Sequence, residues 1–538
     1  MALLTQSAPF AQSYERCNTY PQNLIYKTSY RGVLKAYEAR LETAEPPFLT
    51  HDEKEVKVHF RDWDDLKQRF FDHDAVSEEA LRYQLGEQSH VDPSTGATMW
   101  NMLPLRDSKC RFIFLYGESS TKPLKITPRM LKRLFTYHQV MPAMIDFLSV
   151  FAQPPEKREL GFSGFFDQVT LPHKSTTTHV AGMSHQVTAN SKQHLTVRPG
   201  ASHGPAVAAL GRSGRQYQLC YNLKRVARTK GNARSEVDDQ NWSIQQNEFH
   251  HQFDVSEGTA LWISAKGRLM DYRKEVLELT GGVHGNKPED LSFESRDRCF
   301  ASSLTVHLMN CYWASQDWRG YVKFLEDAIE QKTRHILIGE WISDDFTPES
   351  LQDVQFLEEK ATNAAMVLDA NIEVMTSLRG FYEKLQEHNG FDMKDLCAEV
   401  VLGFVQQITD MIHTFAGYKR RMKLLIEVTE NRKNLLLQKL QSRATRKMED
   451  LTTMSYRETI VMKVITVGTF VFLPATFVSY QDQPDGQASY SGLALERWLE
   501  VTVPLTVVTV LMGLVAFMLA DRRRKRRLPS SFDEKRGA

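Results

Sequence analysis

The sequence lacks several of the short motifs by which many enzymes are recognised. Its 538 residues contain no glycine-rich P-loop, no His-Glu-x-x-His zinc motif and no dinucleotide-binding fingerprint. Carboxylates are scattered along the chain, and nothing in their spacing indicates a catalytic pair. We therefore expect that the protein is not an enzyme, and we keep a membrane-tethered enzyme as the most distant alternative.

Cysteine clusters and an excess of charge are also missing. The 67 basic and 66 acidic residues leave a net charge of +1, which argues against general nucleic-acid binding. The apolar stretch after Met1 is too short for a signal peptide, so we expect the N-terminal part to stay in the cytosol. The six cysteines form no zinc-type spacing, which predicts reduced thiols; they are Cys17, Cys110, Cys220, Cys299, Cys311 and Cys397.

Two long apolar runs stand out near the end of this otherwise hydrophilic chain. Residues 460–480 and 501–520 are each about 20 residues long, which as helix gives roughly 30 Å, the thickness of a bilayer's hydrocarbon core. We predict two transmembrane helices. The alternative is a pair of buried core helices in a soluble domain.

The charges beside these runs predict the topology. Arg443, Arg446 and Lys447 precede the first run, whereas the connecting segment 481–500 is acidic. Positive flanks stay in the cytosol, so we expect a multi-pass protein with both termini cytosolic, its host membrane left open. The basic tail 521–538 begins with a run of cations that we expect to form a collar: Arg522, Arg523, Arg524, Lys525, Arg526 and Arg527.

The part before these runs reads as an α/β cytosolic domain over residues 1–346. Thr127 and Pro128 predict the start of a helix that extends to about Phe151. A polar stretch at 183–240 predicts a mobile loop, centred on 199–215. Apolar runs bounded by turn residues predict strands at 111–116, 217–223, 242–253 and 260–265.

Residues 347–458 read as long cytosolic helices. Apolar residues recur at steps of three and four from Leu351 to Leu385, and His388-Asn389-Gly390 predicts the end of that helix at a glycine cap. A second helix begins near Asp392 and continues toward the membrane region 459–520, either unbroken or interrupted at Gly403 or Gly417.

One face of the first apolar run carries threonines. A helix turns by about 100° per residue, so six residues of this run share one face of the helix. We predict that they line a pore formed by several copies of this helix: Met462, Thr466, Thr469, Leu473, Thr476 and Tyr480. The alternative is that the hydroxyls bond their own backbone four residues back. Thr502, Thr506, Thr509, Gly513, Ala516 and Ala520 form a small-residue stripe on the second run, suited to close helix packing.

Several segments resemble the CorA-type cation transporter superfamily, specifically its divergent fungal members. They are Phe472–Val478 in the first run, Trp242–Ile244, Phe249–Asp254, Leu261–Ile263, Tyr312-Trp313 with Trp318–Tyr321, and Leu357–Glu359 with Asn371. The resemblance implies a CorA-like funnel architecture and a homopentamer, with five first runs around a pore and five second runs outside. It also implies a divalent metal cation channel or transporter with no cofactor beyond a transported or regulatory ion, Mg²⁺ or another divalent cation.

One departure from that family pattern concerns the outer mouth. Where the superfamily has Gly-Met-Asn, this sequence has Gln483-Pro484-Asp485. Rings of Asp482 or Asp485 are still able to attract cations. The alternative is a non-conducting, membrane-anchored scaffold or regulatory protein that has lost the selectivity motif.

Histidines and carboxylates offer a second place for metal. Glu248, His250, His251 and Asp254 lie close in sequence, yet neighbouring residues of a strand point to opposite faces, which makes a shared ion difficult. His179 and His185 lie in the polar stretch without further ligands. The resemblance implies regulatory cation sites, but no acidic pair is assigned to them.

Overall fold

The computed structural model describes residues 8–27, 30–91, 98–103, 105–153, 160–172, 204, 206–228, 242–268, 270–282, 293, 295–338, 348–480 and 492–525. Contacts divide the chain into two units, Met1–Lys433 and Asn434–Ala538, which we describe separately.

The first unit is built on a seven-stranded mixed sheet with the strand order β2-β1-β5-β9-β8-β7-β6. Only β5 and β9 run parallel to each other; the other neighbouring pairs are antiparallel. The strands are β1 (Val58–Asp64), β2 (Arg69–Ala75), β5 (Cys110–Tyr116), β6 (Phe165–Val169), β7 (Gln216–Arg228), β8 (Trp242–Asp254) and β9 (Thr259–Lys266). A separate ribbon pairs β3 (Glu87–Val91) with β4 (Thr98–Met102).

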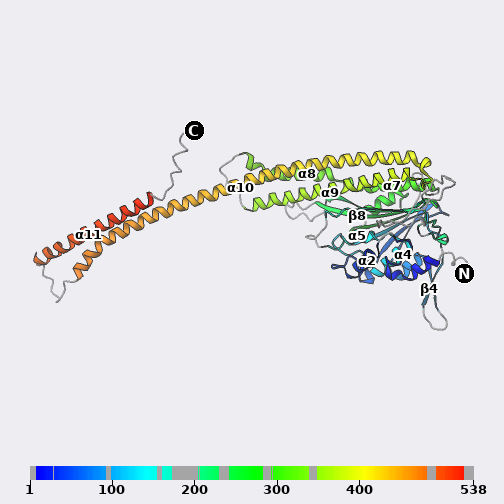
Figure 1. The fold of residues 1–538 in the computed structure, drawn as a ribbon, viewed down its shortest axis with the longest axis horizontal. Helices are drawn as coiled ribbons and strands as arrows, with labels where there is room; N and C mark the ends of the chain where they lie inside the picture. The colour runs from blue at the N-terminus through cyan, green and yellow to red at the C-terminus, as the bar shows by residue number, and fades with distance from the viewer. Residues whose placement is uncertain are drawn as a thin grey trace, which may run out of the picture. The chain divides into compact units, whose positions relative to one another are not determined.

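Helices cover both faces of the sheet (Figure 1). One face packs on α6 (Met270–Leu279), α7 (Arg296–Ser315), α8 (Trp318–Ile338), α9 (Pro348–Glu387) and the first part of α10 (Lys394–Tyr480). The other packs on α1 (Ala8–Glu15), α2 (Arg31–Thr43), α3 (Glu78–Gln84), α4 (Pro128–His138) and α5 (Met144–Leu148). Because successive side chains of a strand alternate, Leu219 enters the first core and Cys220 the second. A sheet covered on both faces explains the near-continuous apolar runs in the sequence.

The predicted hairpin 242–265 is confirmed as β8 and β9, and the predicted strand at 111–116 is β5. Strand β7 is longer than predicted and continues to Arg228. Of the stretch 183–240, the structure describes residue 204 and residues 206–228, and the rest lies outside the described residues.

The helix predicted from Pro128 to Phe151 is wrong in its second half. The Thr127 hydroxyl accepts the amide proton of Met130 as the sequence indicated, but α4 ends at His138. Gln139 adopts the left-handed conformation with φ of 54°, and its side-chain amide donates to the carbonyl of Thr136. The chain then turns through Pro142 into the short helix α5, so two helices stand where one was expected.

Helix α9 matches the predicted long helix, but the glycine after it acts differently from the expected cap. Gly390 is not among the residues with positive φ. A Cβ at Gly390 would lie 2.3 Å from the carbonyl oxygen of Pro172, so close approach of the backbone requires glycine here. The suggested interruption of the next helix is also wrong, because α10 continues through Gly403 and Gly417.

Asn371 fastens α9 to the sheet where strand pairing stops. Strand β6 pairs with β7 only as far as Tyr221. At Lys224, the side-chain amide of Asn371 takes the place of a neighbouring strand: its oxygen accepts the backbone N–H at 3.0 Å and its nitrogen donates to the carbonyl at 2.7 Å. The buried Asn371 thus satisfies two backbone groups that a missing strand leaves open.

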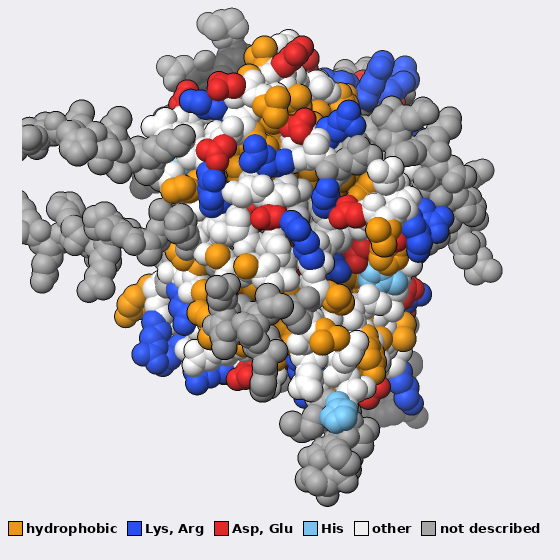
Figure 2. Space-filling view, turned by 90° about the vertical axis from the view of Figure 1, so that its right-hand side faces the viewer, with side chains coloured by type: hydrophobic (Ala, Val, Ile, Leu, Met, Phe, Trp, Pro, Cys, Tyr) orange, Lys and Arg blue, Asp and Glu red, His pale blue; other side chains and the backbone are white. Residues whose placement is uncertain are grey.

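Ion pairs join the first part of α10 to the two helices beside it. Arg421 binds the Glu326 carboxylate of α8 through two nitrogens, at 3.1 and 2.7 Å. Arg432 contacts Glu330 of the same helix at 2.6 Å, and Lys433 pairs with Glu358 of α9. On the face that Figure 2 shows, acidic and basic side chains are interspersed. This face therefore has no large patch of one charge sign that the near-zero net charge of the chain would hide.

The second unit consists of the rest of α10 and α11 (Gly492–Lys525), with Pro504 inside α11. Among the residues described there, apolar side chains are exposed along both helices. Examples are Met462 at 68%, Ile465 at 62% and Met512 at 65% of their full exposure. Soluble monomers rarely leave such a series of apolar side chains uncovered.

Candidate functional site

The predicted pore positions lie on the second half of α10. Thr466 donates its hydroxyl proton to the carbonyl of Met462 at 2.7 Å, and Thr469 donates to that of Ile465 at 2.9 Å. This is the back-bonded arrangement that the sequence offered as the alternative to a pore. A hydroxyl bonded in this way still offers its oxygen as an acceptor, so the bond leaves the pore hypothesis untested.

Other parts of the predicted membrane site are not described. Leu473, Thr476 and Tyr480 belong to α10, but their side chains lie outside the described residues. The mouth residues Asp482, Gln483 and Asp485 lie outside them as well. The collar residues Arg522, Arg523, Arg524 and Lys525 close α11 without described side chains, and Arg526 and Arg527 follow beyond. In the part of the chain that the structure describes, no helix is both long and apolar enough to cross a bilayer.

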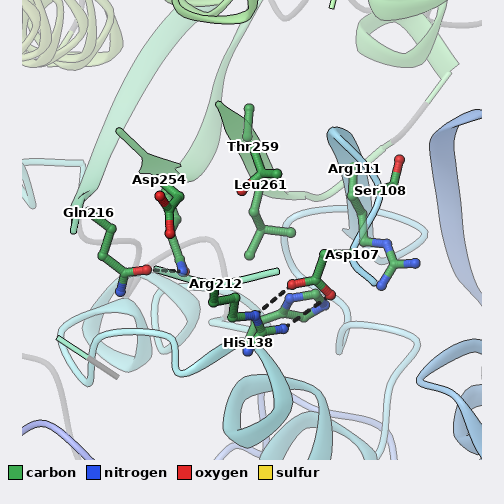
Figure 3. A pocket seen from close by; sticks show the side chains of 11 residues that line it. Asp107, Ser108, Arg111, His138, Arg212, Gln216, Asp254, Thr259 and Leu261 are labelled. Carbon is green, nitrogen blue, oxygen red and sulfur yellow. Dashed lines mark hydrogen bonds and ion pairs between the residues drawn. The ribbon is translucent and has the colours of Figure 1, made fainter. Parts of the chain in front are cut away.

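A buried charged cavity lies at one end of the sheet, between β5, β7, β8 and α4 (Figure 3). Arg212 contacts both carboxylate oxygens of Asp107, at 2.6 and 3.3 Å, and donates to the carbonyl of Tyr137 at 2.5 Å. Arg111 forms a two-pronged pair with Asp62, both contacts being 2.8 Å. Each guanidinium therefore already has a carboxylate partner inside the protein.

The remaining space in this cavity is small. Its volume is about 30 Å³, which suits one water molecule. The Nε2 atom of His138 and the Oε1 atom of Gln252 have no partner among the described residues, and both residues line the cavity. Burial, aided by the two guanidinium charges, holds the pKa of His138 well below its usual value. We interpret the cavity as a structural ion-pair cluster with room for a bridging water.

The residues considered as metal ligands are held apart by the strand. Glu248 and His250 face the core around α4, whereas His251 faces the opposite core and stacks on Trp262, with ring centroids 3.9 Å apart. Asp254 ends β8, where it accepts hydrogen bonds from Ser213 and from the backbone of the turn after it. No group of three metal-ligating side chains occurs in the described part of the chain, and His179 and His185 lie outside that part.

Glu248 is fully buried, and neither carboxylate oxygen has a hydrogen-bond partner among the described residues. Burial raises the pKa of this carboxyl well above its usual value, although the Lys224 charge opposes the shift. Above its unfolded pKa the folded state therefore binds more protons than the unfolded state, and stability falls as the pH rises.

We expect Glu248→Gln to stabilise the first unit by about 1–2 kcal/mol at pH 8, because the amide removes the cost of burying an ionisable acid. The gain should shrink as the pH falls toward 4.5, and denaturant unfolding at several pH values measures it. Glu278→Gln on the exposed side of α6 serves as the control and should change little. A loss of stability in Glu248→Gln at pH 8 would show that the carboxylate is needed in its charged form.

A buried chain of polar side chains runs between the sheet and three helices. Tyr272 of α6 donates to the Asn310 oxygen at 2.9 Å, and Asn310 donates to the Tyr221 hydroxyl at 2.9 Å. His307 of α7 then lies between two hydroxyls, with Nδ1 at 2.8 Å from Tyr221 and Nε2 at 2.8 Å from Tyr382 of α9. The chain links β7 to α6 through Asn310 of α7, and to α9 through the imidazole of His307.

Donor and acceptor roles along this chain follow from its order. The Tyr221 oxygen already accepts from Asn310, so its proton is available for Nδ1 of His307. Burial lowers the pKa of His307 to about 3, which keeps the ring neutral. Its single proton then resides on Nε2 and is donated to Tyr382. Sequence reasoning missed this site, because its members are spread from Tyr221 to Tyr382 with no local pattern.

The polar stretch contains one Gly-x-Ser-x-Gly pattern. Gly200-Ala-Ser-His-Gly204 has the spacing of a serine-hydrolase nucleophile turn. All of these residues except Gly204 lie outside the described part of the chain. The chain after Gly204 forms a single 3₁₀ turn at Ala208–Leu210, whereas a nucleophile turn leads into a helix. The pattern therefore gives no support to an enzyme.

Comparison with known proteins places this architecture in a family. The model of the CorA-like transporters matches residues 12–186 and 183–337, more than half of the chain. The protein therefore belongs to the CorA-like transporters, a family of membrane transport proteins rather than enzymes. The family resemblance predicted from the sequence is confirmed.

The solved structures that it resembles are distant. The CorA magnesium transporter from Methanocaldococcus jannaschii is 12% identical, covering 80% of this chain and 96% of that one with a TM-score of 0.28. The full-length CmaX protein is 13% identical over 56% of this chain and 73% of that one, with a TM-score of 0.22. No curated protein matches the sequence significantly.

Proposed function

We propose that the protein is a homopentameric channel or transporter for divalent metal cations, embedded in a membrane by two helices. Family membership supports the general class. The observation that carries the proposal for this chain is the series of exposed apolar side chains on the second unit, including Val461, Met462 and Ile465 on α10 and Leu511 and Met512 on α11. Lipid and neighbouring protomers are the partners that would cover such surfaces.

In this proposal, residues 460–480 and 501–520 cross the bilayer and both termini lie in the cytosol. The asymmetry of the flanking charges supports this orientation. Five copies of the first span surround the pore, lined by Met462, Thr466, Thr469, Leu473 and Thr476 with Tyr480 at its outer end. Five basic tails form the collar on the cytosolic side.

The transported ion is Mg²⁺ or another divalent cation attracted by rings of Asp482 and Asp485. Magnesium sheds its water shell reluctantly and is commonly held through that shell by oxygen atoms. Gln483-Pro484-Asp485 offers carboxylate and amide oxygens, though not the Gly-Met-Asn of the superfamily. The second candidate is a non-conducting, membrane-anchored scaffold or regulatory protein. The observation that favours it is that Gln483-Pro484-Asp485 stands where the superfamily has Gly-Met-Asn.

Flux measurements on the purified protein separate the two candidates. The full chain, reconstituted in liposomes, should admit Mg²⁺, Zn²⁺, Ni²⁺ or Co²⁺ faster than empty vesicles do. The double variant Asp482→Asn, Asp485→Asn should lower that rate, because it removes the charge at the mouth. A matched change of two exposed acids far from α10 in the fold, Glu53→Gln with Glu79→Gln, should leave the rate unaltered. Pentamers without flux would favour the scaffold.

A further inference from the structure

A cavity lies among the N-terminal segments of the first unit and shares no lining residue with the sites described above. Its volume is about 440 Å³, within the range of about 300–1,000 Å³ that small-molecule sites occupy. It is formed by the 3₁₀ turn Cys17–Thr19 with the residue before it, the loop that follows, and the start of α2. Seven residues line it: Arg16, Thr19, Gln22, Asn23, Lys27, Arg31 and Leu34.

Three of these residues are cations, and no carboxylate is among them. Arg16, Lys27 and Arg31 are exposed, and their side chains have no ion-pair or hydrogen-bond partner among the described residues. Glu38 of α2 is close by, but its carboxylate already accepts from the side-chain amide of Gln22. Cations around one hollow repel one another, so an anion placed between them would be attracted by all three.

The loop that forms one wall is fixed to the protein behind it. The Asn23 side-chain nitrogen donates to the carbonyl of Ser13 at 2.9 Å and to the hydroxyl of Thr136 at 2.8 Å. The backbone N–H of Ile25 donates to the side-chain oxygen of Gln139 at 2.9 Å. Because the protein's own hydrogen bonds hold this loop in place, binding of a ligand requires little further ordering of it.

The same loop leaves one hydrogen-bond acceptor open. The Oδ1 atom of Asn23 is buried and has no partner among the described residues. Its assignment as oxygen is secure, because the other end of the amide must donate to the carbonyl of Ser13. Buried side-chain oxygens normally accept a hydrogen bond, and a hydroxyl group on a ligand would supply one.

We propose that this cavity binds a small molecule that carries several phosphate groups on a hydroxyl-bearing ring, such as an inositol phosphate. The three cations come from three separate segments, which suits a ligand with more than one phosphate. Thr19, Gln22 and Asn23 are able to form hydrogen bonds with ring hydroxyls. The proposal concerns the first unit and is independent of whether the membrane helices conduct.

Binding is measured by titrating the full-length protein, held in phosphatidylcholine nanodiscs, with inositol trisphosphate. We expect saturable binding. The triple variant Arg16→Gln, Lys27→Gln, Arg31→Gln should weaken it by about thirtyfold, because each exposed charge pair contributes up to about fivefold in affinity. All three side chains are exposed, and thermal unfolding verifies that the variant folds.

The matched control removes the same number of charges elsewhere. Arg69→Gln, Arg319→Gln, Lys323→Gln changes three exposed cations that do not line the cavity. It should leave the affinity within about twofold, because salt screens charges at a distance. The proposal is overturned if inositol trisphosphate does not bind saturably, or if the two triple variants weaken binding equally.

The same phosphate and hydroxyl groups occur in soluble inositol phosphates and in the headgroups of phosphoinositide lipids. Repeating the titration in nanodiscs that also contain phosphatidylinositol bisphosphate distinguishes these two sources. A weaker apparent affinity for inositol trisphosphate in those nanodiscs would identify the lipid headgroup as a competing ligand of the cavity. An unchanged affinity would identify the soluble molecule as the ligand.

Discussion

We expect Thr476→Trp to abolish cation flux while leaving the oligomer intact. This is the largest effect that we expect from a single substitution. Five indole rings at one level of a narrow pore would fill it, because the threonine that each replaces has less than half the ring system's volume. Flux into liposomes measures the loss, and the mass of the detergent-solubilised particle verifies assembly.

Phe477→Trp is the control for this substitution. Residue 477 lies about 100° further around the helix, away from the predicted pore face, and already carries an aromatic ring. It should conduct at nearly the normal rate. If Thr476→Trp conducts as well as the unmodified protein does, Thr476 does not face a pore and the assigned helix face is wrong.

We expect the first unit to lose stability steeply as the pH falls below about 6.5. Four buried histidines are neutral in the folded protein: burial lowers the pKa of His250 and of His307 to about 3, and that of His138 and of His251 well below the usual value. In the unfolded chain each titrates near 6.5. Between these values the unfolded state binds more protons, so the stability that these four imidazoles contribute is full above pH 6.5 and is lost toward pH 3.

Each such proton contributes about 1.4 kcal/mol per pH unit, so four histidines together give roughly 5 kcal/mol per unit. The buried Glu248 carboxyl acts in the opposite sense over the same range and lowers the net slope to roughly 4 kcal/mol per unit. Denaturant unfolding followed by tryptophan fluorescence between pH 7.5 and 5 measures the slope. His250→Gln should lower it by about one proton, because the amide is neutral at both ends of the range. Equal stability at pH 7 and pH 5 would contradict the burial of neutral imidazoles.

Local patterns predicted those parts of the fold that local interactions determine. The hairpin of β8 and β9 follows from two apolar runs around a turn that closes at Gly258, whose φ is +68°. The long helices follow from apolar residues at steps of three and four. By contrast, β1 and β2 have polar and aromatic residues without a clear period, and no strand was predicted there.

Long-range pairing limited the prediction of the sites. Nothing near Cys110 in sequence indicates that β5 runs parallel to β9, 150 residues later. The same holds for His307, which meets Tyr221 and Tyr382 only after the sheet and helices pack. The sequence identified Gly390 as the end of a helix. Glycine is required there because of close contact with the backbone of Pro172, which is a tertiary contact that the local sequence does not indicate.

The mass of the particle in mild detergent tests the central claim most directly, since a shared pore requires several copies of the chain. Light scattering that corrects for bound detergent, or native mass spectrometry, should give five times the 61.9 kDa of one chain. A particle containing a single copy would contradict the account, because one protomer has no axis around which its helices are able to enclose an ion path.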